Sequence, residues 1–85
     1  MIEHNIVTAT DLESTDITLF VQQLNHYSDS DIYVQKDGHR INAKSILGMY
    51  ALEIQKGETV TFLISGEETQ IIETIDHFFN GMTQR

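Results

Sequence analysis

Few side chains in this sequence have the types and spacing that catalysis or metal binding requires. Glu73 and His77 stand four residues apart, which places both on one side of a helix, where they could pair or bind a metal weakly. A single helical turn supplies only two ligands, so we expect an ion pair here and no metal site. The chain contains no Cys, which excludes disulfides, thiolate catalysis and Cys-ligated metals. We therefore predict neither a metal nor another cofactor.

Three acidic side chains lie in a polar stretch, residues 10–16, which contains Asp11, Glu13 and Asp16 and no Lys or Arg. An anionic group that approached this stretch would meet like charge. Four histidines lie elsewhere in the sequence, and we expect each at the surface or at a sheet edge: His4, His26, His39 and His77.

Length and charge limit what this chain can be. Its 85 residues and 9.7 kDa suffice for one small core, so we expect a single domain over residues 1–85. Thirteen acidic residues against five Lys and Arg give a net charge of −8 and a pI near 4.6, which disfavours nucleic acids and anionic membranes as partners. The sequence shows no apolar run of about 18 residues and no signal-peptide pattern, so we expect a cytoplasmic protein.

The first two expected elements are a strand and an amphipathic helix. Residues 2–9 are rich in β-branched side chains, which suits a strand. Ser14 or Thr15 can cap the helix that follows, and Asp16 falls in its first turn, where exposed amides favour negative charge. The apolar face of this helix has helical spacing: Ile17, Phe20, Val21, Leu24 and Tyr27.

A β-hairpin is expected around Asp37 and Gly38. Two runs with β-branched residues flank this dipeptide, and both of its positions tolerate a positive φ, as a two-residue hairpin loop requires. Such a loop pairs Val34 with Ile41. The expected apolar face comprises Ile32, Val34, Ile41 and Ala43. The expected basic cluster, on a solvated face, comprises Lys36, Arg40 and Lys44.

A short helix, a fourth strand and a last helix complete the expected fold. Ser45 is a natural N-cap for a helix over residues 46–52, and residues 60–64 alternate as a strand. Ser65 and Glu68 form a capping box that opens the last helix. Its apolar face, before a stop at Asn80 and Gly81, comprises Ile71, Ile72, Ile75, Phe78, Phe79 and Met82. The order βαββαβα predicts an α+β open-faced sandwich of four mostly antiparallel strands with helices on one side.

Residues 42–52, Asn-Ala-Lys-Ser-Ile-Leu-Gly-Met-Tyr-Ala-Leu, carry the most specific motif. This segment resembles the stretch around the regulatory serine of HPr, the histidine-containing phosphocarrier of the bacterial phosphotransferase system, and of its catabolite-repression paralogue in Gram-positive bacteria. Other motifs follow in register, among them Leu-Phe-Val-Gln at 19–22 and Ser-Asp-Ile at 30–32. The resemblance covers residues 6–80 and implies the HPr fold, with three helices on one face of a four-stranded antiparallel sheet.

The loop before the first helix departs from that family. The phosphocarriers have Gly-Leu/Ile-His-x-Arg-Pro there, and the helix amides and the Arg hold a phosphoryl group on the imidazole. If the alignment is anchored on the helix, Glu13 takes the place of the His and Thr15 that of the Arg; without gaps, Ser14 and Asp16 do. Under either register His, Arg and Pro are absent, so we expect no phosphoryl relay, no catalytic residue and no enzyme. Glu13 could instead form an acyl phosphate, or a carboxylate could imitate a phosphorylated loop.

Ser45 and the apolar residues beside it are retained. By resemblance, Ser45 is the site that the bifunctional HPr kinase/phosphorylase modifies, where the helix dipole and Lys44 would favour a phosphate. A LacI-type carbon catabolite repressor would dock on Ile46 and Tyr50, which are exposed docking positions in the family. Leu47 should be intermediate in exposure, and Leu19 extends the surface. Alternatively, these side chains pack under the preceding loop, while two others point into the core: Met49 and Leu52.

Three hypotheses follow for function. The first is an HPr-like regulatory or interaction protein of carbon catabolite control, without the phosphoryl-accepting His. The second is an atypical phosphocarrier of the phosphoenolpyruvate-dependent sugar phosphotransferase system, which accepts phosphate at Glu13 or at a displaced histidine. The third is a degenerate scaffold that binds no partner of that sugar system.

Overall fold

A computed structural model describes residues 1–66 and 68–80; the Glu68 side chain, together with Gly81 and Met82 of the expected last helix, lies outside the described part. The order βαββαβα is as predicted. The elements are β1 (Ile2–Val7), α1 (Ser14–Asn25), β2 (Asp31–Lys36), β3 (His39–Asn42), α2 (Ile46–Leu52), β4 (Thr59–Ser65) and α3 (Glu68–Phe79). None of the three described helices has the length and hydrophobicity that crossing a bilayer requires.

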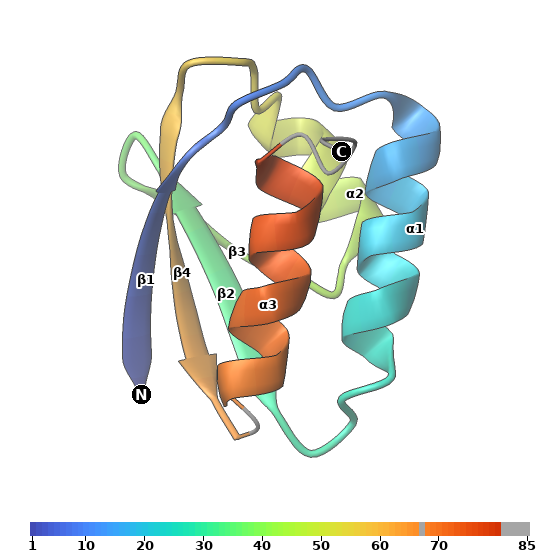
Figure 1. The fold of residues 1–85 in the computed structure, drawn as a ribbon, viewed down its shortest axis with the longest axis vertical. Helices are drawn as coiled ribbons and strands as arrows, with labels where there is room; N and C mark the ends of the chain where they lie inside the picture. The colour runs from blue at the N-terminus through green and yellow to red at the C-terminus, as the bar shows by residue number, and fades with distance from the viewer. Residues whose placement is uncertain (67, 81–85) are drawn as a thin grey trace.

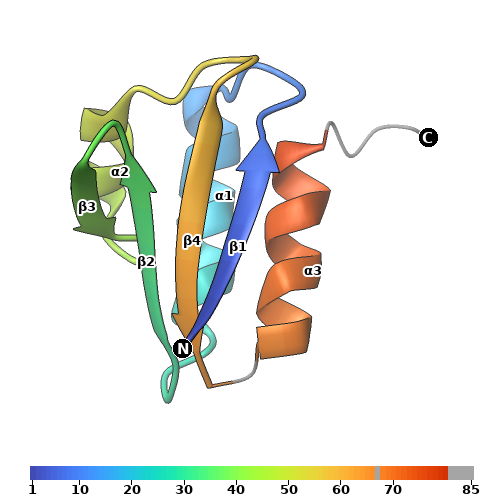
Figure 2. The same ribbon diagram turned by 90° about the vertical axis from the view of Figure 1, so that its left-hand side faces the viewer.

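The four described strands form one antiparallel sheet in the order β1-β4-β2-β3, which leaves β1 and β3 at its edges. Figure 2 shows all three helices on one side of this sheet, and Figure 1 shows α1 and α3 running alongside each other. The architecture is therefore the predicted open-faced sandwich.

The β2–β3 hairpin has the predicted geometry. Asp37 has a φ of 51° and Gly38 a φ of 82°, so both residues of the loop adopt left-handed conformations. Val34 consequently lies opposite Ile41 in the ladder. Val34 is fully buried, while Ile41 packs half-buried against the core.

The core between sheet and helices is organised around the four phenylalanines of the chain. Phe20 packs edge-on against Phe62, Phe78 and Phe79, with ring centroids 5.3–6.0 Å apart. Phe62 and Phe79 are also edge-on, at 5.4 Å. Each such pair adds about 0.5–1.5 kcal/mol beyond area burial, so the cluster fixes α1 and α3 to β4.

The start of α1 differs from the prediction. Glu13, and neither Ser14 nor Thr15, is the N-cap residue, and its carbonyl accepts the first helical bond from Ile17 at 3.0 Å. The Asp16 carboxylate accepts the Glu13 backbone N–H, also at 3.0 Å. This reciprocal contact satisfies a backbone donor that a cap at Ser14 would have left to water, and Ser14 becomes the first helical residue.

Candidate functional site

Ser45 caps α2 as predicted and is exposed. Its Oγ accepts the Gly48 backbone N–H at 3.1 Å, and its carbonyl accepts the Met49 N–H at 3.0 Å. A side chain on Gly48 would press on Ile41 of β3, since a Cβ built there lies 3.2 Å from the Ile41 Cδ1. The glycine therefore lets the first turn of α2 approach β3, and the serine hydroxyl is presented at the surface.

The prediction that Lys44, which precedes this serine, lies on a solvated face is wrong. Lys44 is half-buried, and its Nζ donates to the backbone carbonyls of Tyr27 at 2.6 Å and Ser30 at 2.7 Å. The side chain of Asn25 also donates to the Lys44 carbonyl, at 3.2 Å. The ammonium group thus holds the α1–β2 connection. It could bind a phosphate on Ser45 only if its hydrogen bonds to these two carbonyls were broken.

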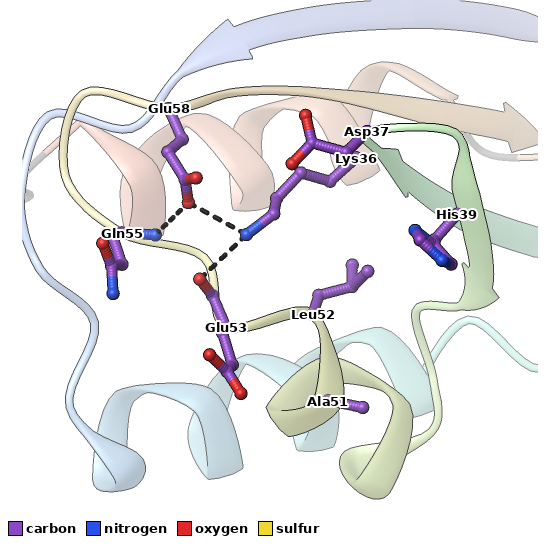
Figure 3. Close-up of a pocket in the computed structure, with 8 residues that line it drawn as sticks. All are labelled: Lys36, Asp37, His39, Ala51, Leu52, Glu53, Gln55 and Glu58. Carbon is purple, nitrogen blue, oxygen red and sulfur yellow. Dashed lines mark hydrogen bonds and ion pairs between the residues drawn. The ribbon is translucent and has the colours of Figure 1, made fainter.

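Lys36 was also predicted on this solvated face, and that prediction is wrong as well. Arg40, the third member of the predicted basic cluster, is exposed. The Lys36 Nζ donates to the Glu53 carbonyl at 2.9 Å and pairs with the Glu58 carboxylate at 3.1 Å, as Figure 3 shows. Glu53 ends α2 with a φ of 51°, so the lysine holds a left-handed C-cap in place.

Glu58 completes this network at the edge of a pocket of about 460 Å³ between the hairpin and the end of α2. Its carboxylate accepts the Gln55 backbone N–H at 2.7 Å. This bond and the Lys36 ammonium hold the pKa of the Glu58 carboxyl below its usual value. The network at this pocket therefore joins β2, the end of α2 and the connection that leads to β4.

The loop of residues 10–16 contains Glu13 and Ser14, the two residues predicted for the position of the phosphohistidine, and both are exposed at the start of α1. Glu13 is the N-cap, and the Ser14 carbonyl accepts the Tyr50 hydroxyl at 3.2 Å. Asp11 accepts the Lys56 backbone N–H at 3.1 Å, so the α2–β4 connection lies against this loop, at the end of the molecule where Figures 1 and 2 show both connections. No local pattern indicates this contact, because its two residues are 45 positions apart.

The four histidines belong to other segments of the chain: β1, the end of α1, β3 and α3. His4 of β1 bonds Asp76 of α3 at 2.7 Å. Among residues 1–66 and 68–80, this pair and Lys36–Glu58 are the ion pairs present, so the expected pairing of Glu73 with His77 is wrong. The His77 ring instead lies edge-on to Phe78, at 5.6 Å. In the described ranges no group of three or more potential ligands could hold a metal ion.

Four large apolar side chains of α1 and α2 are exposed, and we call them the α1–α2 apolar surface: Leu19, Ile46, Leu47 and Tyr50. Ile46 and Tyr50 are exposed to 36% and 39% as expected, whereas Leu47, expected to be intermediate, is 78% exposed. Met49 and Leu52 take up the core-facing side of this short helix, so Leu47 projects away from the sheet. These side chains therefore do not pack under the preceding loop.

Tyr50 joins the two helices of this surface. Its hydroxyl lies 3.3 Å from the Thr18 Oγ1 as well as 3.2 Å from the Ser14 carbonyl, so α2 is fixed to the first turn of α1. Leu19 follows Thr18 directly in α1. The structure thus brings the serine-bearing helix, the start of α1 and the exposed apolar residues into one region.

The family model described as the PTS HPr component phosphorylation site matches residues 2–81. The chain belongs to the HPr family. The HPr-like protein Crh of Bacillus subtilis and that of Halalkalibacterium halodurans are each 41% identical to this HPr-family protein over 61 residues, which are 72% of this chain and 71% of theirs. The crystal structure of HPr-C-His from Thermoanaerobacter tengcongensis has a TM-score of 0.79 at 29% identity, covering 93% of this chain and 96% of that one.

Membership in the HPr family confirms the resemblance drawn from residues 42–52. HPr-family proteins are phosphocarriers and regulatory proteins, not enzymes, so the prediction that this chain is no enzyme is also confirmed. They act with other proteins of the phosphotransferase and catabolite control systems.

Proposed function

We propose that this HPr-family protein is a cytoplasmic regulator of carbon catabolite control, phosphorylated at Ser45 by HPr kinase/phosphorylase and carrying no phosphoryl group on residues 10–16. One observation carries the proposal. Ser45 is exposed beside the α1–α2 apolar surface, whereas the loop that carries the phosphohistidine in the family has carboxylates, and its alternative acceptor positions are Glu13 and Ser14.

Electrostatics supports the part of the proposal that excludes phosphoryl transfer to this loop. A helix N-terminus favours an anion by about 0.3–1 kcal/mol at an exposed site. A like charge at 4 Å costs about 1 kcal/mol in water and about 4 kcal/mol near a protein surface. Asp11, Glu13 and Asp16 lie in and before the first turn of α1, so a phosphoryl group in this loop would meet like charge, and residues 10–16 contain no Lys or Arg to offset it.

A phosphate on Ser45 stays available to a partner. Its charge of about −1.5 to −2 is favoured by the first turn of α2. The neighbouring Lys44 ammonium already bonds two carbonyls and does not neutralise that charge without leaving them. We therefore expect the phosphate to be read by cationic side chains of the partner, with a LacI-type repressor docking on Ile46, Leu47, Tyr50 and Leu19.

Incubation with HPr kinase/phosphorylase and ATP tests the site. We expect one phosphoryl group on the wild type and none on Ser45→Asn, in which the Asn side chain still caps α2. Ser14→Ala is the matched control, because it removes a second exposed serine hydroxyl at a helix start, and it should be labelled like the wild type. Label on Ser45→Asn, or none on the wild type, refutes the proposed site.

A second incubation separates this proposal from the atypical phosphocarrier. With phosphoenolpyruvate and Enzyme I of the phosphotransferase system, we expect no phosphoryl adduct on the wild type. An adduct that acid hydrolyses and base leaves intact would indicate a phosphohistidine, and one that base also releases would indicate an acyl phosphate on Glu13. Either adduct would overturn the regulatory assignment.

A further inference from the structure

The α1–α2 apolar surface has an acidic border. Asp11, Glu13 and Asp16 precede or begin α1, and the bond from the Tyr50 hydroxyl to the Ser14 carbonyl sets this turn directly beside the surface. Glu53 follows the last residue of α2. Its carboxylate points away from Lys36, which contacts only its carbonyl (Figure 3). Carboxylates therefore flank the surface at the start of α1 and at the end of α2.

Few cations offset this charge within the part of the chain that the structure describes. The Lys44 ammonium is held by the Tyr27 and Ser30 carbonyls. Lys56 is exposed at this end, where its backbone bonds Asp11. One exposed lysine thus stands against four carboxylates, and the border is negative.

We infer that the kinase that phosphorylates Ser45 docks on the α1–α2 apolar surface with an apolar centre bordered by Lys and Arg side chains. The inference rests on the proposed function, which supplies the docking event, and adds the chemistry of the partner. Apolar contact alone would not select among partners, whereas like charge facing like charge across an interface costs several kcal/mol. A partner with an acidic border, suited to a phosphocarrier that has an Arg in this loop, is therefore rejected here.

The charge at Glu13 offers the sharpest test, because the side chain is exposed and lies beside the surface without belonging to Ser45 or its cap. We measure the rate of Ser45 phosphorylation by HPr kinase/phosphorylase over a series of NaCl concentrations. For the wild type, KM should rise with salt while kcat stays constant. Salt screens the attraction between the two proteins as they associate, and it does not affect the phosphoryl transfer step. Glu13→Gln should raise KM about threefold and Glu13→Lys about tenfold at low salt.

Glu3→Gln and Glu3→Lys are matched controls, because Glu3 is an exposed residue of the edge strand β1 and the charge changes are identical. Each should leave KM within about twofold of the wild type. Thermal unfolding of every variant shows whether the fold persists. If Glu13→Lys is unstable, the test rests on Glu13→Gln, which keeps a side-chain oxygen at the helix start.

The outcomes separate the two proposals. If Ser45 is labelled but KM does not change with salt and responds equally to substitutions at positions 3 and 13, the inferred basic border of the partner is refuted. The proposed function is then unaffected. A KM that falls in Glu13→Lys indicates an acidic partner and also refutes the basic border. Absence of label on Ser45 removes the proposed function, and the inference that rests on it falls too.

Discussion

Replacing Lys44 by Met tests whether its ammonium is a structural clamp or a phosphate ligand. Met keeps the length and the apolar stem of the side chain and removes the charge. In the wild type the ammonium donates to the Tyr27 and Ser30 carbonyls at 2.6 and 2.7 Å, between the end of α1 and the start of β2. The variant leaves both carbonyls without this donor.

The size of the effect follows from these two bonds. A hydrogen bond to a charged group contributes about 1.5–3 kcal/mol when buried, and solvent reaches this half-buried site, so we take about 2–3 kcal/mol for the pair. A domain of this size is stable by only about 5–10 kcal/mol. The melting temperature should therefore fall by about 10–20 °C.

Urea unfolding followed by far-UV circular dichroism gives the free energy of unfolding directly. Lys56→Met is the matched control, because the same substitution at this exposed lysine should change stability by less than about 0.5 kcal/mol. Well below its melting temperature, Lys44→Met should still be phosphorylated on Ser45 at a rate within twofold of the wild type. Unchanged stability combined with lost phosphorylation would refute the structural assignment and make Lys44 a group that acts on the phosphate.

Four further substitutions probe the fold and the surface. Gly66→Ala should cost about 3 kcal/mol or more in urea unfolding, because Gly66 has a φ of 100° and a Cβ there would clash with Ser30, while Gly38→Ala, at a φ of 82° with open space around it, should cost about 1–2 kcal/mol. Glu58→Gln should be less stable than the wild type at pH 7, and the difference should shrink as the pH falls below the ordinary pKa of 4.5, because a carboxyl with a lowered pKa stabilises the fold only while ionised; a difference that stays constant as the pH falls would exclude the charge as the cause. Tyr50→Phe should increase amide hydrogen exchange in the first turn of α1 without lowering the melting temperature by more than about 5 °C, and an unchanged exchange pattern would contradict the proposed link between the helices.

What the sequence could predict was set by neighbours along the chain. The Asp37-Gly38 loop fixes the hairpin register because only a few residues tolerate two consecutive left-handed conformations. Ser45 caps α2 because its oxygen needs to reach only three residues forward, to Gly48. The family, too, was readable from one contiguous segment, residues 42–52.

What the sequence could not predict depends on partners that folding brings together. Lys36 and Lys44 are long, flexible cations, and only the closed fold places carbonyls 14 to 17 residues away within their reach. His4 pairs with Asp76, which is 72 residues away in the sequence, whereas the local pair expected between Glu73 and His77 is not formed. Surface pairs on one helix contribute a few tenths of a kcal/mol, so a neighbouring aromatic ring is enough to displace them. The docking roles of the α1–α2 apolar surface remain predictions.

The four phenylalanines, which pack edge to face, have a consequence for where the chain tolerates substitution. They belong to α1, β4 and α3, whereas the loop of residues 10–16 reaches the interior only through Leu12, at its margin. Exposed substitutions away from caps and cores usually alter stability by less than about 0.5 kcal/mol. Substitutions in this loop at positions other than the cap residues Glu13 and Asp16 can therefore alter its surface chemistry while the aromatic interior keeps its packing.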